Sequence, residues 1–158
     1  MFKKQVKKLR VLFVDEKNDL TSQIAEYFTR EMFGGMYEVY SAGPKHDIVD
    51  CEMISAMYQK GEDMRRQISK DFRNQDLLPA DAVFDIVVYL DRPVFEEWSA
   101  KTPWKGRQML CEIGSKADFN ATDDMELANC YSELIEKVRM WVKENMGDVE
   151  KLRSMMSA

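Results

Sequence analysis

The stretch from residue 11 to residue 28, VLFVDEKNDLTSQIAEYF, places a short apolar run before a polar loop and an amphipathic helix. The first four residues are typical of a strand that is buried on both faces of a parallel sheet. Apolar residues then recur at helical spacing, with Thr21 or Ser22 available as the N-cap. A strand, a tight loop and a helix start direct backbone N–H groups and a helix dipole at one point. This stretch therefore predicts an anion-binding type of loop.

Further strands and helices follow the same alternating pattern along the chain. Tyr37–Tyr40 and Phe84–Leu90 predict two more strands, and Met109–Ile113 is a candidate for the last one. Residues 49–60 have the i, i+3, i+4 spacing of an amphipathic helix, and residues 71–82 predict a helix or a turn. Alternation of this kind predicts right-handed crossovers and a parallel sheet that is covered on both faces.

Ligands bind such sheets at the carboxyl ends of the strands. This rule is expected to bring Asp15, Ser41 and Asp91 to one crevice, because each lies at or near the end of a predicted strand. Gly43 lies two residues after Ser41, where the backbone must turn sharply beside the loop that begins at Asp15.

The last predicted helix carries a long apolar stripe, formed by Leu127, Tyr131, Leu134, Val138, Trp141 and Val142. Asp123 and Glu126 have the spacing of a capping box at its start, and Gly147 is expected to end it. The segment from Asp148 to Ala158 is expected to be frayed, or helical only on a partner.

Composition narrows the function classes. The chain of 158 residues suits a single domain over residues 1–158, with a core at about 8–147 and a basic N-terminal tail. Its net charge of −5 argues against a nucleic-acid or anionic-membrane surface. No apolar run reaches the roughly 18 residues of a membrane span. Three cysteines without a CxxC pair fit unpaired thiols in a reducing cytoplasm.

The loop resembles the phosphate loop of the low-molecular-weight protein tyrosine phosphatases and the thioredoxin-coupled arsenate reductases. In that family a strand is followed by Cys, five residues, Arg, Ser and a helix. Asn18, Ser22, Ala25 and Glu26 match the family residues. The nucleophilic Cys of the family corresponds to Asp15, its loop Gly to Lys17, and its phosphate-binding Arg to Thr21.

The resemblance continues beyond the loop. Ser41-Ala42-Gly43 matches the family's Ser-Ala-Gly, and Phe84–Leu90 resembles its next buried strand. A redox Cys follows that strand in the reductases, whereas Asp91 stands here. Asp118 corresponds to the Asp that acts as the general acid in the phosphatases. The resemblance implies an α/β domain of three layers with a four-stranded parallel sheet, and a site from which the family chemistry has been lost.

The ligand loop, Asp15, Glu16, Lys17, Asn18, Asp19, Leu20, Thr21 and Ser22, holds three acids and one lysine. At about 4 Å and an effective dielectric constant of about 20, two like charges repel by about 4 kcal/mol. Phosphate and arsenate are therefore expected to bind poorly.

Three interpretations of the loop remain open on the sequence alone. In the first, the loop is a solvated helix start without chemistry. In the second, it is a cation site in which Asp15, Glu16 and Asp91 hold Mg²⁺. In the third, it is a pocket that recognises a cationic partner. The run VLFVDE also resembles response-regulator receiver domains, but the 76-residue separation of Asp15 and Asp91 is too long for one βαβ unit.

The sequence predicts a binding or regulatory pseudoenzyme with no cofactor, no nucleic-acid partner and no membrane contact. Its ligand is expected to be an unknown protein or a small cation. The alternative is an enzyme that uses Asp15 in place of Cys, either for metal-assisted phosphoryl transfer or as a phosphatase or arsenate reductase.

Overall fold

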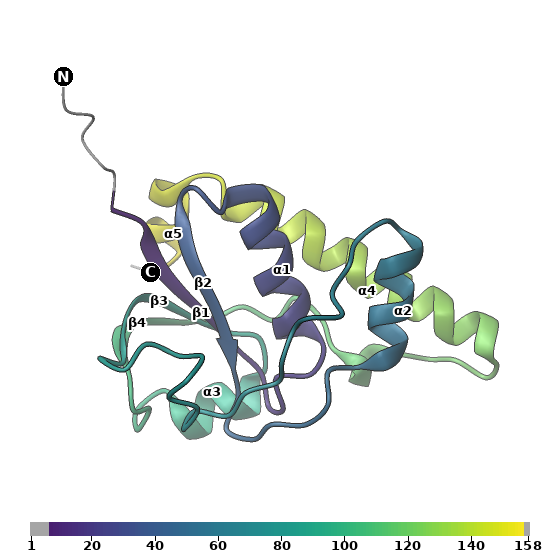
Figure 1. The fold of residues 1–158 in the computed structure, drawn as a ribbon, viewed down its shortest axis with the longest axis horizontal. Helices are drawn as coiled ribbons and strands as arrows, with labels where there is room; N and C mark the ends of the chain where they lie inside the picture. Colours follow the sequence, from purple (N-terminus) through teal and green to yellow (C-terminus); the bar gives the residue numbers. More distant parts are fainter. Residues whose placement is uncertain (1–6, 157–158) are drawn as a thin grey trace.

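The chain folds around one parallel sheet of four strands in the order β2-β1-β3-β4. The computed structural model describes residues 7–156 (Figure 1). The strands are β1 (Leu9–Val14), β2 (Tyr37–Ala42), β3 (Val83–Tyr89) and β4 (Lys105–Leu110). The helices are α1 (Thr21–Phe33), α2 (Cys51–Gln59), α3 (Arg92–Trp98), α4 (Asp124–Asn145) and α5 (Val149–Met156), with a short 3-10 helix at Lys116–Asp118. The predicted basic tail begins with residues 1–6, which lie outside the described residues.

The central strand β1 divides the core into two halves by the alternation of its side chains. Val11 and Phe13 pack into a large apolar cluster with α1 and α4. Leu12 and Val14 point to the opposite face, where they pack with α3 and with loop residues such as Trp104. All four of these β1 side chains are fully buried, which explains why the strand is a continuous apolar run.

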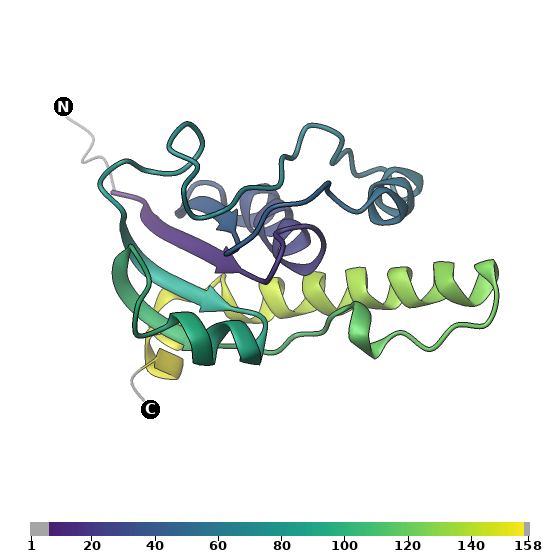
Figure 2. The ribbon, with the colours of Figure 1, turned by 90° about the horizontal axis from the view of Figure 1, so that it is seen from below.

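The sheet is covered on both faces, so the predicted three-layer α/β architecture is confirmed. Figures 1 and 2 show α1 and α4 on one side of the sheet and α3 on the other. The third layer is thin, because long irregular segments supply much of the cover beside α3. Trp104 contacts Phe72 and Phe84 edge-on in this layer.

From residue 71 to the end of β4 the sequence predictions were only partly right. Residues 71–82 form turns, and the seven-residue helix α3 was not expected. The last strand was predicted at 109–113 but lies at 105–110. Its first three residues are exposed, so this edge strand begins without the apolar pattern by which strands are recognised.

The C-terminal segment corrects the prediction of a frayed tail. Residues 149–156 form α5, and Leu152 is fully buried in the main apolar cluster. The start of α4 is close to the predicted capping box, since the Asp123 side chain accepts the N–H of Glu126. The Glu126 carboxylate, however, accepts from Thr122 rather than from the backbone of Asp123. Within residues 7–156, none of the helices has the length and apolar content to cross a membrane.

Candidate functional site

The loop from β1 to α1 is organised around the Asp15 carboxylate. One of its oxygens accepts the backbone N–H of Asn18 at 2.7 Å, and the other accepts the N–H of Ser22 at 2.9 Å. The sequence predicted Thr21 or Ser22 as the N-cap of α1, and this was wrong. Leu20 occupies the cap position without a side-chain cap bond, and Asp15 supplies an acceptor from seven residues earlier.

Asn18 holds the loop in its tight shape. Its φ of 50° lies in the left-handed region, which asparagine tolerates better than most residues. Its side-chain amide donates to the Ser22 hydroxyl, and its side-chain oxygen accepts from the backbone of Lys70 and from Gln23. The fully buried Asn18 therefore connects the loop, the first turn of α1 and the distant segment at residue 70.

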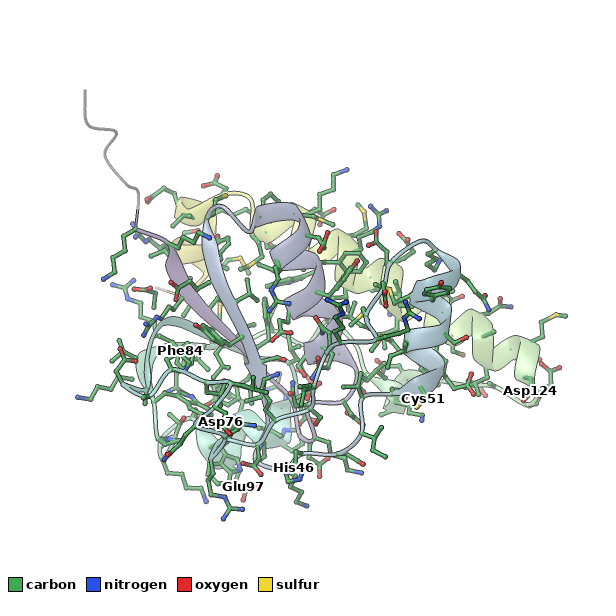
Figure 3. All side chains as sticks on the ribbon, viewed as in Figure 1. His46, Cys51, Asp76, Phe84, Glu97 and Asp124 are labelled. Atoms are coloured by element: carbon green, nitrogen blue, oxygen red, sulfur yellow. The ribbon has the colours of Figure 1, made fainter. Side chains whose placement is uncertain are left out.

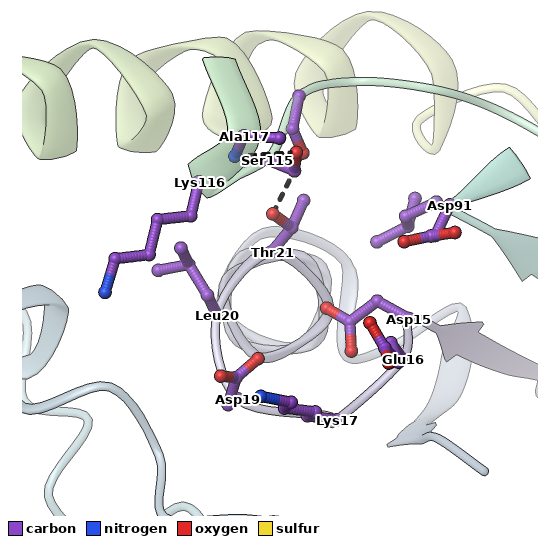
Figure 4. A pocket seen from close by; sticks show the side chains of 12 residues that line it. Asp15, Glu16, Lys17, Asp19, Leu20, Thr21, Asp91, Ser115, Lys116 and Ala117 are labelled. Carbon is purple, nitrogen blue, oxygen red and sulfur yellow. Dashed lines mark hydrogen bonds between the residues drawn. The ribbon is translucent and has the colours of Figure 1, made fainter. Parts of the chain in front are cut away.

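A cavity of about 270 Å³ opens over this loop. In Figure 4 the loop side chains surround the start of α1, and Thr21 reaches toward the segment that carries Ser115. The cavity is lined by Asp15, Glu16, Lys17, Asp19, Leu20, Thr21, Leu90, Asp91, Gly114, Ser115, Lys116 and Ala117. Six of the eight predicted loop residues are in this set, and Asn18 and Ser22 are fully buried below them.

Sequence reasoning missed the roof of the cavity, which is the segment 114–117. The Thr21 hydroxyl donates to the carbonyl of Gly114 at 2.9 Å and so joins this segment to the loop. Residues 114–117 precede α4 without any apolar periodicity, so no local signal placed them at the site.

Asp118, the predicted general-acid position, does not line the cavity. Its carboxylate accepts the backbone N–H of Ser115 at 2.9 Å within the short 3-10 helix. Ser41 was expected in the same crevice, but it does not line the cavity; it is fully buried, and its hydroxyl donates to Glu26. Asp15 and Asp91 do share the cavity, as expected from the strand ends.

The proposed magnesium ligands are not arranged as a metal site. Asp91 is the N-cap of α3, and one of its carboxylate oxygens accepts the N–H of Val94 at 3.1 Å. The Glu16 carboxylate is exposed and lies 3.8 Å from the ammonium group of Lys45. Across residues 7–156 no group of three or more His, Cys, Asp or Glu side chains is placed to hold a metal ion.

None of the three cysteines lines the cavity. Cys51 is exposed at the first residue of α2 (Figure 3), and neither Cys111 nor Cys130 lines the cavity. Burial raises the pKa of the Cys111 thiol, which makes its thiolate form less available. No arginine lines the cavity either, so its positive groups are those of Lys17 and Lys116.

Burial raises the pKa of Asp15 to about 6, because removing a carboxylate from water disfavours its charged form. The hydrogen bonds from the Ser22 and Asn18 backbone work in the opposite direction, but burial outweighs them. Burial also raises the pKa of Asp19, and the negative charge of Asp50 adds to this effect. The loop therefore accommodates its central carboxylate at an electrostatic cost.

This cost predicts a pH dependence of stability. Between the ordinary pKa of 3.8 and about 6, the folded protein binds a proton at Asp15 that the unfolded chain has released. Stability from this group is therefore full below about pH 4 and falls by about 3 kcal/mol as pH rises to about 6. Urea denaturation of wild type and of Asp15→Asn from pH 4 to pH 7 measures it, and the variant should lack this component.

Asp91→Asn is the matched control, because it removes one carboxylate from the same cavity while asparagine can still cap α3. If the stability of wild type changed with pH in the same way as that of Asp15→Asn, the pH dependence could not be assigned to Asp15.

The family assignment rests on most of the chain. A family model described as low molecular weight phosphotyrosine protein phosphatase matches residues 10–149. This chain belongs to that family. The matched region contains the sheet, the loop and α4, so the predicted resemblance is confirmed.

Individual relatives agree with this assignment. Arsenate reductase 1 of Staphylococcus epidermidis is 36% identical over 85 residues, which are 54% of this chain and 61% of that protein. The match therefore spans less than two thirds of the length of this relative.

Solved structures confirm the fold. The low molecular weight protein tyrosine phosphatase from T. tengcongensis has a TM-score of 0.62 at 22% identity, covering 93% of this chain and 99% of its own. The tyrosine phosphatase Wzb from Escherichia coli K30, in complex with sulphate, has a TM-score of 0.61 at 17% identity, covering 87% and 99%. An arsenate reductase in the oxidised state has a TM-score of 0.62 at 21% identity, covering 85% and 94%.

Proposed function

We propose that this protein is a catalytically degenerate member of the family, whose loop serves binding rather than phosphoryl transfer. The observation that carries the proposal is the Asp15 carboxylate on the N–H groups of Asn18 and Ser22. The family resemblance places the nucleophilic cysteine at this position. Here the helix start already interacts with an anion, and that anion is covalently part of the loop.

A bound oxyanion would meet negative charge instead of a positive clamp. Asp15, Glu16, Asp19 and Asp91 line the cavity against Lys17 and Lys116. Lys116 lies 3.6 Å from Asp50, which reduces the positive charge available to a ligand. The family's arginine position is Thr21, whose hydroxyl is engaged by Gly114. Without a bidentate guanidinium, the loop lacks the main source of phosphate affinity.

The same charges favour a cation. An ammonium or guanidinium group in the cavity would lie beside carboxylates while its apolar stem contacts Leu20 and Leu90, which also line the wall. We infer that the ligand is a small cation or a basic side chain of a partner protein.

The proposal predicts that the purified protein lacks the family activities. It should neither hydrolyse p-nitrophenyl phosphate nor reduce arsenate with thioredoxin, with or without added Mg²⁺, because the cavity contains no thiol and no guanidinium. In steady-state assays, the rate with the protein is expected to equal the background rate of a buffer blank.

Turnover that disappears in Asp15→Ala would contradict the proposal and would favour a carboxylate nucleophile. Glu96→Ala is the matched control, because Glu96 is an exposed acid of α3 that does not line the cavity.

A further inference from the structure

A second hollow lies along α4, away from the loop. Its volume is about 680 Å³, and its lining shares no residue with the cavity beside Asp15. It is lined by Glu112, Ile113, Glu133, Glu136, Lys137, Met140, Trp141 and Glu144, which we call the α4 groove. Figure 2 shows the segment that follows β4 running alongside α4. Glu112 and Ile113 of this segment line the groove opposite the residues of α4.

The floor of the α4 groove is apolar. Met140 is 39% exposed and lines the groove from α4. Trp141 contacts Phe13 edge-on at a ring distance of 6.2 Å and also lines the groove. Ile113 completes this floor from the segment after β4. Ile113 and Trp141 also pack against the main apolar cluster, so this apolar strip of the groove adjoins the core.

The rim of the α4 groove is acidic. Four glutamates and Lys137 line the groove. Glu112 pairs with Arg92 and Glu136 pairs with Arg139, each at 2.8 Å, so the negative charge offered to an occupant is mainly that of Glu133 and Glu144. Glu133 and Glu144 lie eleven positions apart on one face of α4, which is about 16 Å along the helix axis. An occupant of this groove must therefore supply apolar side chains in the middle and positive charge at both ends.

We propose that the α4 groove binds an amphipathic segment of a partner protein, about three helical turns long, with an apolar stripe flanked by Lys or Arg. A helix of this kind presents its apolar side chains to a hydrophobic groove at i, i+3, i+4 and i+7. Its basic residues would lie opposite Glu133 and Glu144, and complementary charge selects the partner and its orientation. This binding is independent of the ligand of the loop.

A model peptide of Leu and Lys tests the proposal. The peptide has about 14 residues and carries Leu at i, i+3, i+4 and i+7. Calorimetry should show saturable binding to the full chain, and Glu133→Lys with Glu144→Lys should weaken it at least about tenfold. The matched control is Glu96→Lys with Glu97→Lys on α3, which makes the same change in net charge at exposed positions that do not line the groove and should change the Kd less than about twofold.

Two further measurements separate the groove from general charge attraction. The same peptide with Glu in place of Lys should not bind, and NMR should show shifts at the Met140 methyl and the Trp141 indole. Equal weakening by both pairs of substitutions, or unshifted Met140 and Trp141 signals, would overturn the proposal. A dimer in sedimentation that is lost in Met140→Lys would also overturn it, because the occupant would then be a second copy.

Discussion

Asp15→Cys combined with Thr21→Arg is expected to reverse the ligand preference of the loop. Wild type should bind acetyl-arginine methylamide and reject inorganic phosphate, whereas the double variant should bind phosphate and lose the cation. The cysteine removes the carboxylate whose oxygens occupy the N–H groups of Asn18 and Ser22. The arginine adds charge-assisted hydrogen bonds of roughly 1.5–3 kcal/mol each. Two such bonds raise phosphate affinity by at least about a hundredfold in calorimetry.

The single variants show which feature decides the preference. Thr21→Arg alone should gain little phosphate affinity, because its guanidinium would pair with the carboxylates of the cavity. Thr21→Val is the control for losing the hydroxyl that donates to Gly114. Phosphate affinity in Thr21→Arg equal to that of the double variant would show that Asp15 does not block the loop, and the proposed function would then lose its basis.

Gly43→Ala is expected to give the largest loss of stability among single substitutions near the site. A Cβ at this position would lie 2.4 Å from the carbonyl oxygen of Asp15 and 2.8 Å from that of Glu16. Both are backbone atoms, so the contact is relieved only if the loop moves. Overpacking of this kind costs about 3 kcal/mol, and the shifted loop should also weaken ligand binding. Urea denaturation and calorimetry measure the two effects.

Gly35→Ala is the matched control, because a Cβ at Gly35 meets no atom within 4 Å. It should change the free energy of unfolding by less than about 0.5 kcal/mol, as most exposed substitutions do. If Gly43→Ala were as mild as Gly35→Ala, the close approach of the two segments would be refuted.

Local patterns predicted the buried strands and the main helices well. β1 and β3 are apolar because both of their faces are covered, and the stripe of α4 follows from its position on the sheet. The edge strand β4 and the helix α5 were mispredicted. The exposed start of β4 has no apolar periodicity, and α5 is short, so its burial depends on the core that it joins.

The sequence by itself determined that a strand, an acidic loop and a helix follow one another, because hydrophobic periodicity is encoded within a few residues. The resemblance to the family also predicted that Asp15 and Thr21 stand at the family's cysteine and arginine positions. Only the tertiary structure decided that the Asp15 carboxylate turns inward onto Asn18 and Ser22, and that Gly114 lies above Thr21. Side-chain direction and contacts between residues 93 positions apart depend on packing, which no local pattern records.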